Sequence, residues 1–345
     1  MSTHITAQVC AFLTGLCKIA FVNADSLDKK SGLRPVNIYT DLDAIANLIE
    51  ICFGNNLDPD GREYVRQIRR AAQNPSYISW ITGSGERVSY PLFGYVWVEE
   101  EKVVGNLTLI PFRVRREWYY FIANVATHPD YRRRGIARKL TECALQHAQN
   151  HGASAAWLQV RDDNEAAYQL YLSFNMVERA RRSSWQSKAN QLVFPEPLPE
   201  GLTIGKRRPC DWQLQQEWLQ ATYPPEVAWN LNFRLEHFGP NWWHSLIRFL
   251  HDRQYRMWAI YAQDCPIGLA ALESTHHHAD TLWVACDPKW ENLVIQTLLY
   301  RIRYDTQDRR PLLVNYPAYR AAQAFQESGF ELQNTLIWME KRFKT

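Results

Sequence analysis

The chain lacks the cysteine spacings that mark metal and redox sites. No C-x-x-C pair occurs in its 345 residues, which excludes a zinc knuckle and a thioredoxin-like pair. Its seven cysteines are odd in number and scattered, without the spacing of a disulfide framework: Cys10, Cys17, Cys52, Cys143, Cys210, Cys265 and Cys286. Because such a set suits a reducing compartment, we expect a cytoplasmic protein.

An excess of one charge and long apolar runs are also missing. The 39 Lys and Arg residues nearly balance 36 Asp and Glu residues, so bulk electrostatics does not favour nucleic acid as a partner. The apolar stretch at residues 9–22 is too short to span a bilayer, contains Lys18 and has no Lys or Arg before it, unlike a signal peptide. We expect no nucleic-acid or membrane partner. Residues 1–32 are interpreted as a poorly ordered leader or as the product of a start codon placed too early.

The chain is long enough to hold two hydrophobic cores. At roughly 100–200 residues per domain, 345 residues predict two domains, and 46% hydrophobic residues with 22% charged ones are typical of a globular protein. Residues 187–201 contain Pro195, Pro197 and Pro199, which predicts a stiff linker. The expected domains are therefore residues 33–186 and 202–345.

The start of the first domain shows helical periodicity after a short apolar run. We predict a strand at Val36–Tyr39 and a helix from Leu42 to Cys52 that Thr40 or Asp41 caps. A second helix carries an arginine face, interpreted as solvated rather than as a surface for RNA or an acidic substrate: Arg62, Arg66, Arg69 and Arg70.

Strands and helices then alternate through the rest of the domain. A hairpin is predicted over residues 92–112 and a further strand over 118–127, followed by a helix that Gly152 ends. Residues 156–160 read as a strand and 164–172 as a helix. This order predicts an α/β (α+β) fold.

The second half repeats the first. The segment LTIGKRRPCDWQLQQEWL parallels VNIYTDLDAIANLI, and TLWVACDPKWENLVIQTLL parallels ANVATHPDYRRRGIARKL. Pro129 matches Pro288, and Asn175-Met176 matches Gly329-Phe330. The order of elements survives across the domain, so we infer a duplication.

A loop in the first domain has the properties of an anion site. Residues 132–137, RRRGIA, lie between the predicted end of a strand and the start of a helix. Free first-turn N–H groups and the helix dipole favour an anion there, and Gly135 removes the Cβ that would block its approach. Neighbouring arginines add charge-assisted hydrogen bonds to phosphate.

This loop is followed, one helix and one strand later, by Asn164-x-x-Ala167-x-x-Leu170-Tyr171. Together they resemble the GNAT family of acetyl-CoA-dependent N-acetyltransferases. The stretch NVATHPDYRRRGIARKL…LQVRDDNEAAYQLYLSFNM is especially similar to the ribosomal-protein alanine N-acetyltransferase branch. The resemblance implies two GNAT-like domains, each a mixed, mostly antiparallel sheet flanked by helices. It also implies acetyl-CoA as co-substrate and no metal.

The resemblance also implies roles for particular residues. Pantetheine would be bound by the main chain of Val125, Ala126 and Thr127 and by the side chain of Asn164. The pyrophosphate would be bound by the backbone amides of Arg133, Arg134, Gly135, Ile136, Ala137 and Arg138. Tyr171 would protonate the leaving thiolate, because a positioned phenol is a suitable general acid for a thiol of pKa ~8.5. The N–H of Val125 would stabilise the oxyanion.

The sequence departs from the branch at the general base. Gln159 stands where that branch has a glutamate, and an amide cannot take a proton. The base therefore stays open among Glu117, His128, Asp162 and Asp163, acting through water, or none of them with the amine arriving neutral. Asn175-Met176 replaces the usual Gly-Phe, a mild change because Asn tolerates the left-handed conformation.

The second half has lost the residues of this chemistry. Glu291, Val294 and Gln296 replace Arg132, Gly135 and Ala137, and Phe325 replaces Tyr171. A carboxylate and a β-branched residue would repel and obstruct a pyrophosphate, so we expect a degenerate second domain. The run His276–His278 falls in a predicted turn without other ligands, and no metal site is expected.

We therefore predict an N-acetyltransferase that moves acetyl from acetyl-CoA to a primary amine by direct attack in a ternary complex. The acceptor is a protein N-terminus, a lysine or a small-molecule amine, and the chain is a monomer or homodimer. The alternative is a non-catalytic acyl-CoA sensor or interaction module. Retention of both Asn164 and Tyr171 favours the enzyme, because a sensor needs no thiolate acid.

Overall fold

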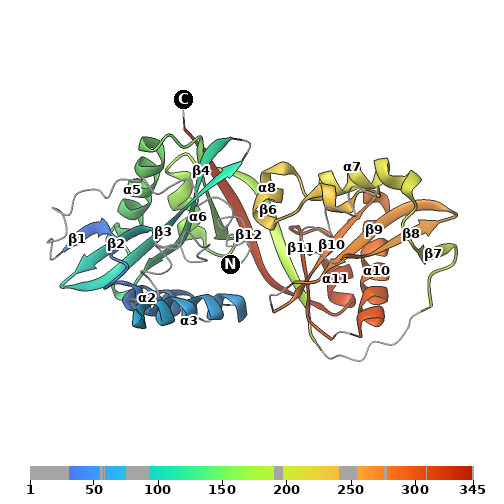
Figure 1. The fold of residues 1–345 in the computed structure, drawn as a ribbon, viewed down its shortest axis with the longest axis horizontal. Helices are drawn as coiled ribbons and strands as arrows, with labels where there is room; N and C mark the ends of the chain where they lie inside the picture. The colour runs from blue at the N-terminus through green and yellow to red at the C-terminus, as the bar shows by residue number, and fades with distance from the viewer. Residues whose placement is uncertain are drawn as a thin grey trace. The chain divides into compact units, whose positions relative to one another are not determined.

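A computed structural model describes residues 31–54, 57, 59–74, 93–114, 116–189, 197–240, 255–275, 278–307 and 309–343 (Figure 1). The chain forms two compact units. Unit 1 consists of Met1–Arg179, Asn230–Asn232 and Trp338–Thr345, and unit 2 of Ala180–Trp229 and Phe233–Ile337. Most of the expected leader, residues 1–30, and residues 190–196 of the expected linker lie outside the described part.

Unit 1 is built on strands in the order β1-β2-β3-β4-β5-β12. Its strands are β1 Gly32–Pro35, β2 Gly94–Glu99, β3 Lys102–Val114, β4 Glu117–Thr127 and β5 Ala155–Arg161, with the end of β12, Phe330–Arg342. Pairing is antiparallel from β1 to β4, and β4 and β5 are parallel. The expected mixed, mostly antiparallel sheet is confirmed.

Helices cover both faces of this sheet. In Figure 1, α2 (Leu42–Phe53) and α3 (Pro59–Gln73) lie below the strands, and α5 (Ile136–Asn150) lies above them. The apolar faces of α2 and α3 bury a shared cluster that includes Ile45, Ile49, Val65 and Ile68 against Val96 of β2. Helix α6 (Glu165–Leu172) leads to β6 (Val177–Ser187). The arginines of α3 form ion pairs or hydrogen bonds with Glu50, Glu63 and Leu57, which agrees with a solvated face.

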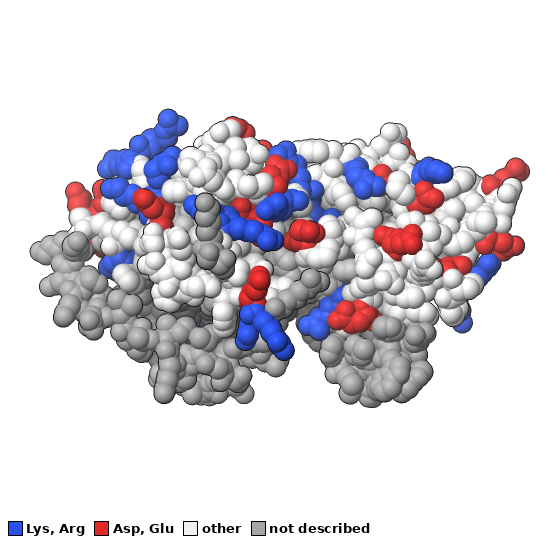
Figure 2. All heavy atoms as spheres, turned by 90° about the horizontal axis from the view of Figure 1, so that it is seen from above, with Lys and Arg blue, Asp and Glu red and all other residues white. Residues whose placement is uncertain are grey.

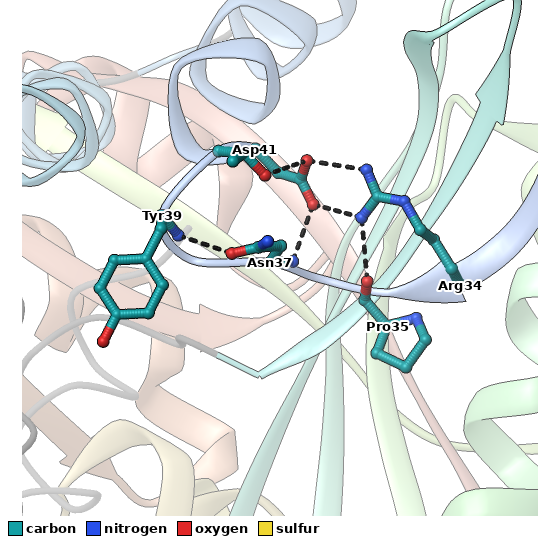
Figure 3. A network of polar contacts seen from close by, with 6 residues as sticks. Arg34, Pro35, Asn37, Tyr39 and Asp41 are labelled. Carbon is teal, nitrogen blue, oxygen red and sulfur yellow. Dashed lines mark hydrogen bonds and ion pairs between the residues drawn. The ribbon is translucent and has the colours of Figure 1, made fainter. Parts of the chain in front are cut away.

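The first strand differs from the prediction. It spans Gly32–Pro35 rather than Val36–Tyr39, because residues 38–40 form a turn. The Asp41 carboxylate holds this turn (Figure 3): it accepts both Arg34 guanidinium nitrogens at 2.6 and 2.8 Å and the Asn37 N–H at 2.8 Å. A bidentate arginine pair of this kind fixes both distance and angle. It ties the start of α2 to β1.

Unit 2 repeats this arrangement with strands in the order β12-β6-β11-β10-β9-β8-β7. Its strands are β7 Leu202–Gly205, β8 Tyr255–Ala262, β9 Cys265–Glu273, β10 Asp280–Cys286 and β11 Leu312–Pro317. Its helices are α7 Trp212–Thr222, α8 Pro225–Leu231, α10 Glu291–Thr306 and α11 Ala322–Glu327. Short 3₁₀ turns at Pro129–Tyr131 and Pro288–Trp290 precede α5 and α10 at matching places.

The duplication is visible in the packing of each unit. In unit 1, a Cβ at Gly105 of β3 would overlap the side chain of Ile136 at the start of α5. In unit 2, a Cβ at Gly268 of β9 would overlap Val294 near the start of α10. Each unit therefore uses a strand glycine to bring its main helix close to the sheet. The two halves share this close contact between helix and strand glycine, although their sequences have diverged.

The units divide the chain differently from the expected domains. Residues 182–186 of β6 pair with β11 inside unit 2. The end of β12 and the residues after it, Trp338–Thr345, belong to unit 1, where Glu340 forms an ion pair with Arg179 at 2.8 Å. Composition and proline content predict linkers but carry no information on strand pairing. The sequence analysis therefore assigned each of these two segments to the domain of the residues next to it in the chain.

Positively and negatively charged side chains are interspersed on the face drawn in Figure 2. Within the described ranges, no helix combines the length and apolar character needed to cross a bilayer.

Candidate active site

The site begins where two parallel strands separate. β4 and β5 pair from Tyr119↔Ala155 to Ile122↔Leu158. Both strands continue beyond that point, to Thr127 and Arg161, without pairing to each other. Their main-chain groups there are not used by the β4–β5 ladder, so the gap offers hydrogen-bond donors and acceptors to a ligand.

A β-bulge lies beside this gap. Asn106 of β3 opposes Ala126, and Thr108 opposes Ala123, so Asn124 and Val125 together oppose Leu107. Asn124 adopts a left-handed backbone with φ 51°. A bulge leaves a residue unpaired and redirects the strand. Val125 and its neighbours Ala126 and Thr127 line the cavity described below.

The loop after β4 ends at the N-terminus of α5. Gly135 caps the helix with φ 79°, a left-handed conformation, and a Cβ built on it would have nothing within 4 Å. Glycine is therefore required by its backbone angle, and the open space around it is available to a ligand. The first-turn amides of α5 have no partners inside the helix. These features give the loop the geometry of an anion site.

The arginines of this loop differ in their contacts. Arg132 Nε donates to the Thr127 carbonyl at 3.3 Å, and Arg134 donates to the Asp130 carbonyl at 3.2 Å and lies over the Tyr131 ring. The guanidinium of Arg138 lies 5.4 Å from the Phe174 ring centroid. Arg133 has a left-handed backbone, φ 66°, and its side chain has no polar partner in the described part of the chain.

Helix α6 closes the other side of the site. The Asn164 side chain caps the helix, because its Oδ1 accepts the Ala167 N–H at 3.2 Å. Its Nδ2 amide, without a partner among described residues, is left for a ligand. Tyr171, one helical turn from Ala167, is 5% exposed. Burial raises the pKa of its phenol above the usual value, so the hydroxyl stays protonated at neutral pH.

These groups line one cavity of about 790 Å³, within the range of small-molecule and cofactor sites. The structure brings together every residue predicted for the site except Arg134: Val125, Ala126, Thr127, Arg133, Gly135, Ile136, Ala137, Arg138, Asn164 and Tyr171. Arg134 points instead to Glu99, with 3.6 Å between guanidinium and carboxylate. Its backbone amide is still part of the loop.

Sequence reasoning missed the contribution of α2. Cys52 and Phe53 line the cavity, and the Cys52 thiol donates to the Thr127 carbonyl at 3.3 Å. Burial raises the pKa of this thiol, partly opposed by Arg132. In the sequence, Cys52 is one more apolar position of a helix, and only its spacing marks it as inward-facing.

The four candidate bases are poorly placed or occupied. Glu117 begins β4, eight residues and about 26 Å of strand from Val125, and accepts the Tyr119 hydroxyl at 2.6 Å. His128 accepts the Asp130 N–H and does not line the cavity. Asp163 does line it, but the Arg161 guanidinium at 2.7 Å lowers the pKa of its carboxyl. Asp162 is not among the lining residues.

Gln159, at the position of the missing glutamate, lies one residue beyond the last paired residue of β5. Its Nε2 donates to Asn230 Oδ1 at 3.0 Å. Asn230 belongs to the segment Asn230–Asn232, which comes from the later half of the chain and is part of unit 1. Gln159 is thus held in a hydrogen bond between two side-chain amides.

The matching place in unit 2 is filled by the protein itself. β9 and β10 keep an unbroken register from Cys286↔Gly268 to Thr281↔Glu273, so β10 has no bulge. The Tyr223 hydroxyl accepts the Val284 N–H at 3.1 Å and donates to the Val284 carbonyl at 3.3 Å. Val284 is the counterpart of Val125, so its main-chain groups are no longer available to a ligand.

The anion position of unit 2 is also taken. The Glu291 carboxylate begins α10, accepts the Tyr316 hydroxyl at 2.8 Å and pairs with Arg320 at 2.6 Å. Phe325, the counterpart of Tyr171, is fully buried and stacks on Trp185 with 5.0 Å between ring centroids. A carboxylate thus stands at the place that corresponds to the loop of unit 1, and a buried packing residue stands at the place of Tyr171.

Among the described residues, no group of three or more His, Cys, Asp or Glu side chains is arranged to hold a metal ion. His276 and His277 lie outside the described residues.

Comparison with known proteins agrees with this geometry. Residues 44–176 match the family model described as "Acetyltransferase (GNAT) family". The [ribosomal protein bS18]-alanine N-acetyltransferase of Escherichia coli K12 is 37% identical over 62 residues, 18% of this chain and 42% of that enzyme. N-alpha-acetyltransferase 30 of Schizosaccharomyces pombe is 33% identical over 97 residues, 27% of this chain and 64% of that protein. The alignments thus span about two fifths to two thirds of these relatives.

The fold is similar over most of the chain. The crystal structure of a GCN5-related N-acetyltransferase from Sphaerobacter thermophilus superposes with a TM-score of 0.56 at 14% identity, covering 93% of this chain and 98% of that one. The expectation of two GNAT-like units is confirmed. The part of the chain that matches the GNAT acetyltransferase family, residues 44–176, contains the bulge, the loop and Tyr171.

Proposed function

We propose that unit 1 transfers an acetyl group from acetyl-CoA to a primary amine, on a protein N-terminus, a lysine or a small molecule. The observation that supports this most is the single cavity that joins the N-terminus of α5, the open edge of β4 and Tyr171. An anion site, unpaired main-chain groups and a buried phenol in one cavity match the three parts of acetyl-CoA: the diphosphate, the pantetheine arm and the thioester.

In this proposal, different groups of unit 1 bind the pyrophosphate and the pantetheine arm of acetyl-CoA. The amides of residues 133–138 and the Arg133 guanidinium bind the pyrophosphate, since both the helix dipole and the positive charge favour an anion. The main chain of Val125–Thr127 and the Asn164 Nδ2 amide bind pantetheine. The fit rests on the Asn164 amide and on the part of β4 that does not pair with β5, where the Thr127 carbonyl already accepts Cys52 and Arg132.

The reaction is a direct displacement. The amine nitrogen attacks the thioester carbonyl, a C–N bond forms, and the C–S bond breaks as Tyr171 gives its proton to the departing sulfur. The Val125 N–H stabilises the oxyanion of the tetrahedral intermediate. None of the four carboxylate and imidazole candidates both lines the cavity and lacks a partner, so the amine arrives neutral. The nitrogen loses its second proton to water, and water returns a proton to Tyr171.

Unit 2 supports the fold and does not bind acetyl-CoA in this proposal. The Tyr223 hydroxyl and the Glu291–Arg320 pair occupy the positions that pantetheine and pyrophosphate take in unit 1. An anion brought beside Glu291 without free donors is strongly disfavoured.

One observation favours the alternative of a non-catalytic acyl-CoA sensor: Gln159 cannot take a proton and is engaged with Asn230. The two functions are separated by release of free CoA thiol from acetyl-CoA with three acceptor classes, namely peptides with free N-termini, N-terminally blocked lysine peptides, and small amines. Mass spectrometry of the acceptor records the acetyl group. The enzyme gives thiol release that depends on one acceptor class. Tight CoA binding with no release for any amine assigns the sensor.

Attack by a neutral amine predicts how kcat/KM depends on pH. The value of kcat/KM rises tenfold per pH unit until the pH reaches the acceptor's own pKa, and acceptors of lower pKa reach their plateau earlier. A plateau at the same pH for acceptors of different pKa would instead reveal a general base in the protein.

A further inference from the structure

The bulge in β4 is held in place by side chains from three elements. The Asn124 carbonyl accepts the Asn106 Nδ2 amide of β3 at 3.1 Å. The Asn124 Nδ2 amide donates to the Tyr64 hydroxyl of α3 at 3.0 Å and lies 3.4 Å from Thr108 Oγ1. Asn106 is 1% exposed, and Tyr64 and Thr108 are 6% exposed each. Because polar groups are buried only with partners, this network is costly to break and specifies one geometry.

The fold does not need this bulge. In unit 2, β10 takes the same place in the sheet with an unbroken register. The counterpart of Asn124 there is Trp283, a buried side chain that donates to Glu273 at 2.9 Å. A left-handed, non-glycine residue in a strand carries strain. Unit 1 keeps a left-handed residue in β4, whereas none of the described residues of β10 in unit 2, whose site is filled, has a left-handed backbone.

The network acts on the residue next to it. Val125 follows Asn124 directly, lines the cavity and belongs to the two residues that oppose Leu107. The direction of the Val125 N–H depends on the backbone angles of Asn124, because the two residues share a peptide bond within the bulge. Preorganised donors stabilise an oxyanion only when they already point at its position, and displacement by about 1 Å costs about a hundredfold in rate.

We propose that Asn124 is a positioning residue: its side-chain amide, anchored on Tyr64, holds the bulge that aims the Val125 N–H at the acetyl carbonyl. This inference rests on the proposed function, since it requires acetyl-CoA in the cavity. It assigns Tyr64 as the support of that amide and Asn106 as the support of the Asn124 main-chain carbonyl. None of the three side chains touches the reacting atoms.

The test uses the full-length chain with acetyl-CoA carrying ¹³C at the acetyl carbonyl, observed by ¹³C NMR. A hydrogen bond to the carbonyl oxygen moves its resonance downfield, so the bound wild type differs from free acetyl-CoA. In Asn124→Gly, which keeps the left-handed backbone without the amide, and in Tyr64→Phe, most of that displacement is lost. Affinity for CoA, measured by calorimetry, stays within about threefold, because the phosphate loop is untouched.

Two control variants test whether a change in the ¹³C resonance of bound acetyl-CoA is specific to Asn124 and Tyr64. Asn175→Gly makes the same change at another left-handed asparagine, φ 59°, outside β4. Tyr119→Phe removes a hydroxyl that bonds Glu117 at the far end of β4. Both leave the bound resonance at its wild-type position. If Asn124→Gly does not fold, Tyr64→Phe alone decides.

The outcomes separate this inference from the proposed function. A wild-type resonance in both Asn124→Gly and Tyr64→Phe, with bound acetyl-CoA, overturns the positioning role and leaves the transferase intact. An absence of any bound signal in the wild type means that acetyl-CoA is not the ligand, and both proposals fall.

Discussion

At the scale of single residues, Gly135 decides whether an anion can approach α5. The empty space around it accommodates a glutamate side chain, and a carboxylate at a helix N-terminus interacts favourably with the dipole. Although φ 79° strains the backbone of any residue other than glycine, we expect the Gly135→Glu variant to fold. The same carboxylate faces the pyrophosphate, so we expect CoA binding to disappear in calorimetry.

Gly152 provides the control for that variant. It has φ 69°, open surroundings and lies just beyond the other end of α5. Gly152→Glu carries the same backbone strain and the same charge and should bind CoA like the wild type. Equal CoA affinity of folded Gly135→Glu and the wild type would show that the anion site has been misplaced.

Tyr171 is the second residue whose role can be isolated. Tyr171→Phe keeps the buried ring and removes only the proton donor. We expect turnover to fall by roughly 10²–10⁴-fold, the range for a general acid, with little change in CoA affinity. Because burial raises the pKa of the phenol, wild-type kcat should show no loss of this acid up to the usual tyrosine pKa. Full turnover in Tyr171→Phe would make Tyr171 a packing residue.

At the scale of elements, the position of α2 depends on the Arg34–Asp41 pair (Figure 3). Both side chains are largely buried, at 16% and 5% exposure. Asp41→Ala leaves the guanidinium without its partner, so we expect a loss of about 3 kcal/mol in the local stability of α2. Faster hydrogen exchange of α2 amides, with unchanged exchange in α10, is the measurement.

Two further variants test the cause of that loss. Replacing both partners, Arg34→Met with Asp41→Leu, removes the unpaired charge and should restore part of the protection. Glu63→Ala breaks the exposed pair with Arg66 and should leave exchange in α2 unchanged. Unaltered α2 protection in Asp41→Ala would mean that apolar packing alone holds the helix.

At the scale of the whole molecule, the filled site of unit 2 predicts one CoA per chain. Calorimetry on the full chain should give a stoichiometry of one, and Gly135→Glu in the full chain should give no heat. The full chain is the right material, because Trp338–Thr345 belongs to unit 1 and a fragment ending near residue 190 would lack them. A stoichiometry near two, or residual tight binding in Gly135→Glu, would locate a site in unit 2.

The phosphate loop and the α6 residues were predictable because each is local. The run from Arg132 to Ala137 contains its own glycine, cations and helix start, and Asn164 and Tyr171 share one short helix. The structure places nearly all of these residues in one cavity, and their roles stay predictions. The duplication could also be predicted from the sequence, because the two halves keep the same order of apolar segments although individual residues differ.

Only the tertiary structure decided the features that depend on distant pairs. The bulge at Asn124 requires the register of β3 and a hydroxyl from α3, 60 residues earlier. The occupation of the second site requires Tyr223 to meet Val284, 61 residues later. A sequence pattern records what each residue prefers locally, whereas strand register and long-range contacts follow from the packing of the whole chain. Thus the residue types that we propose for acetyl transfer could be identified in the sequence, whereas the bulge and the long-range contacts that position them could not.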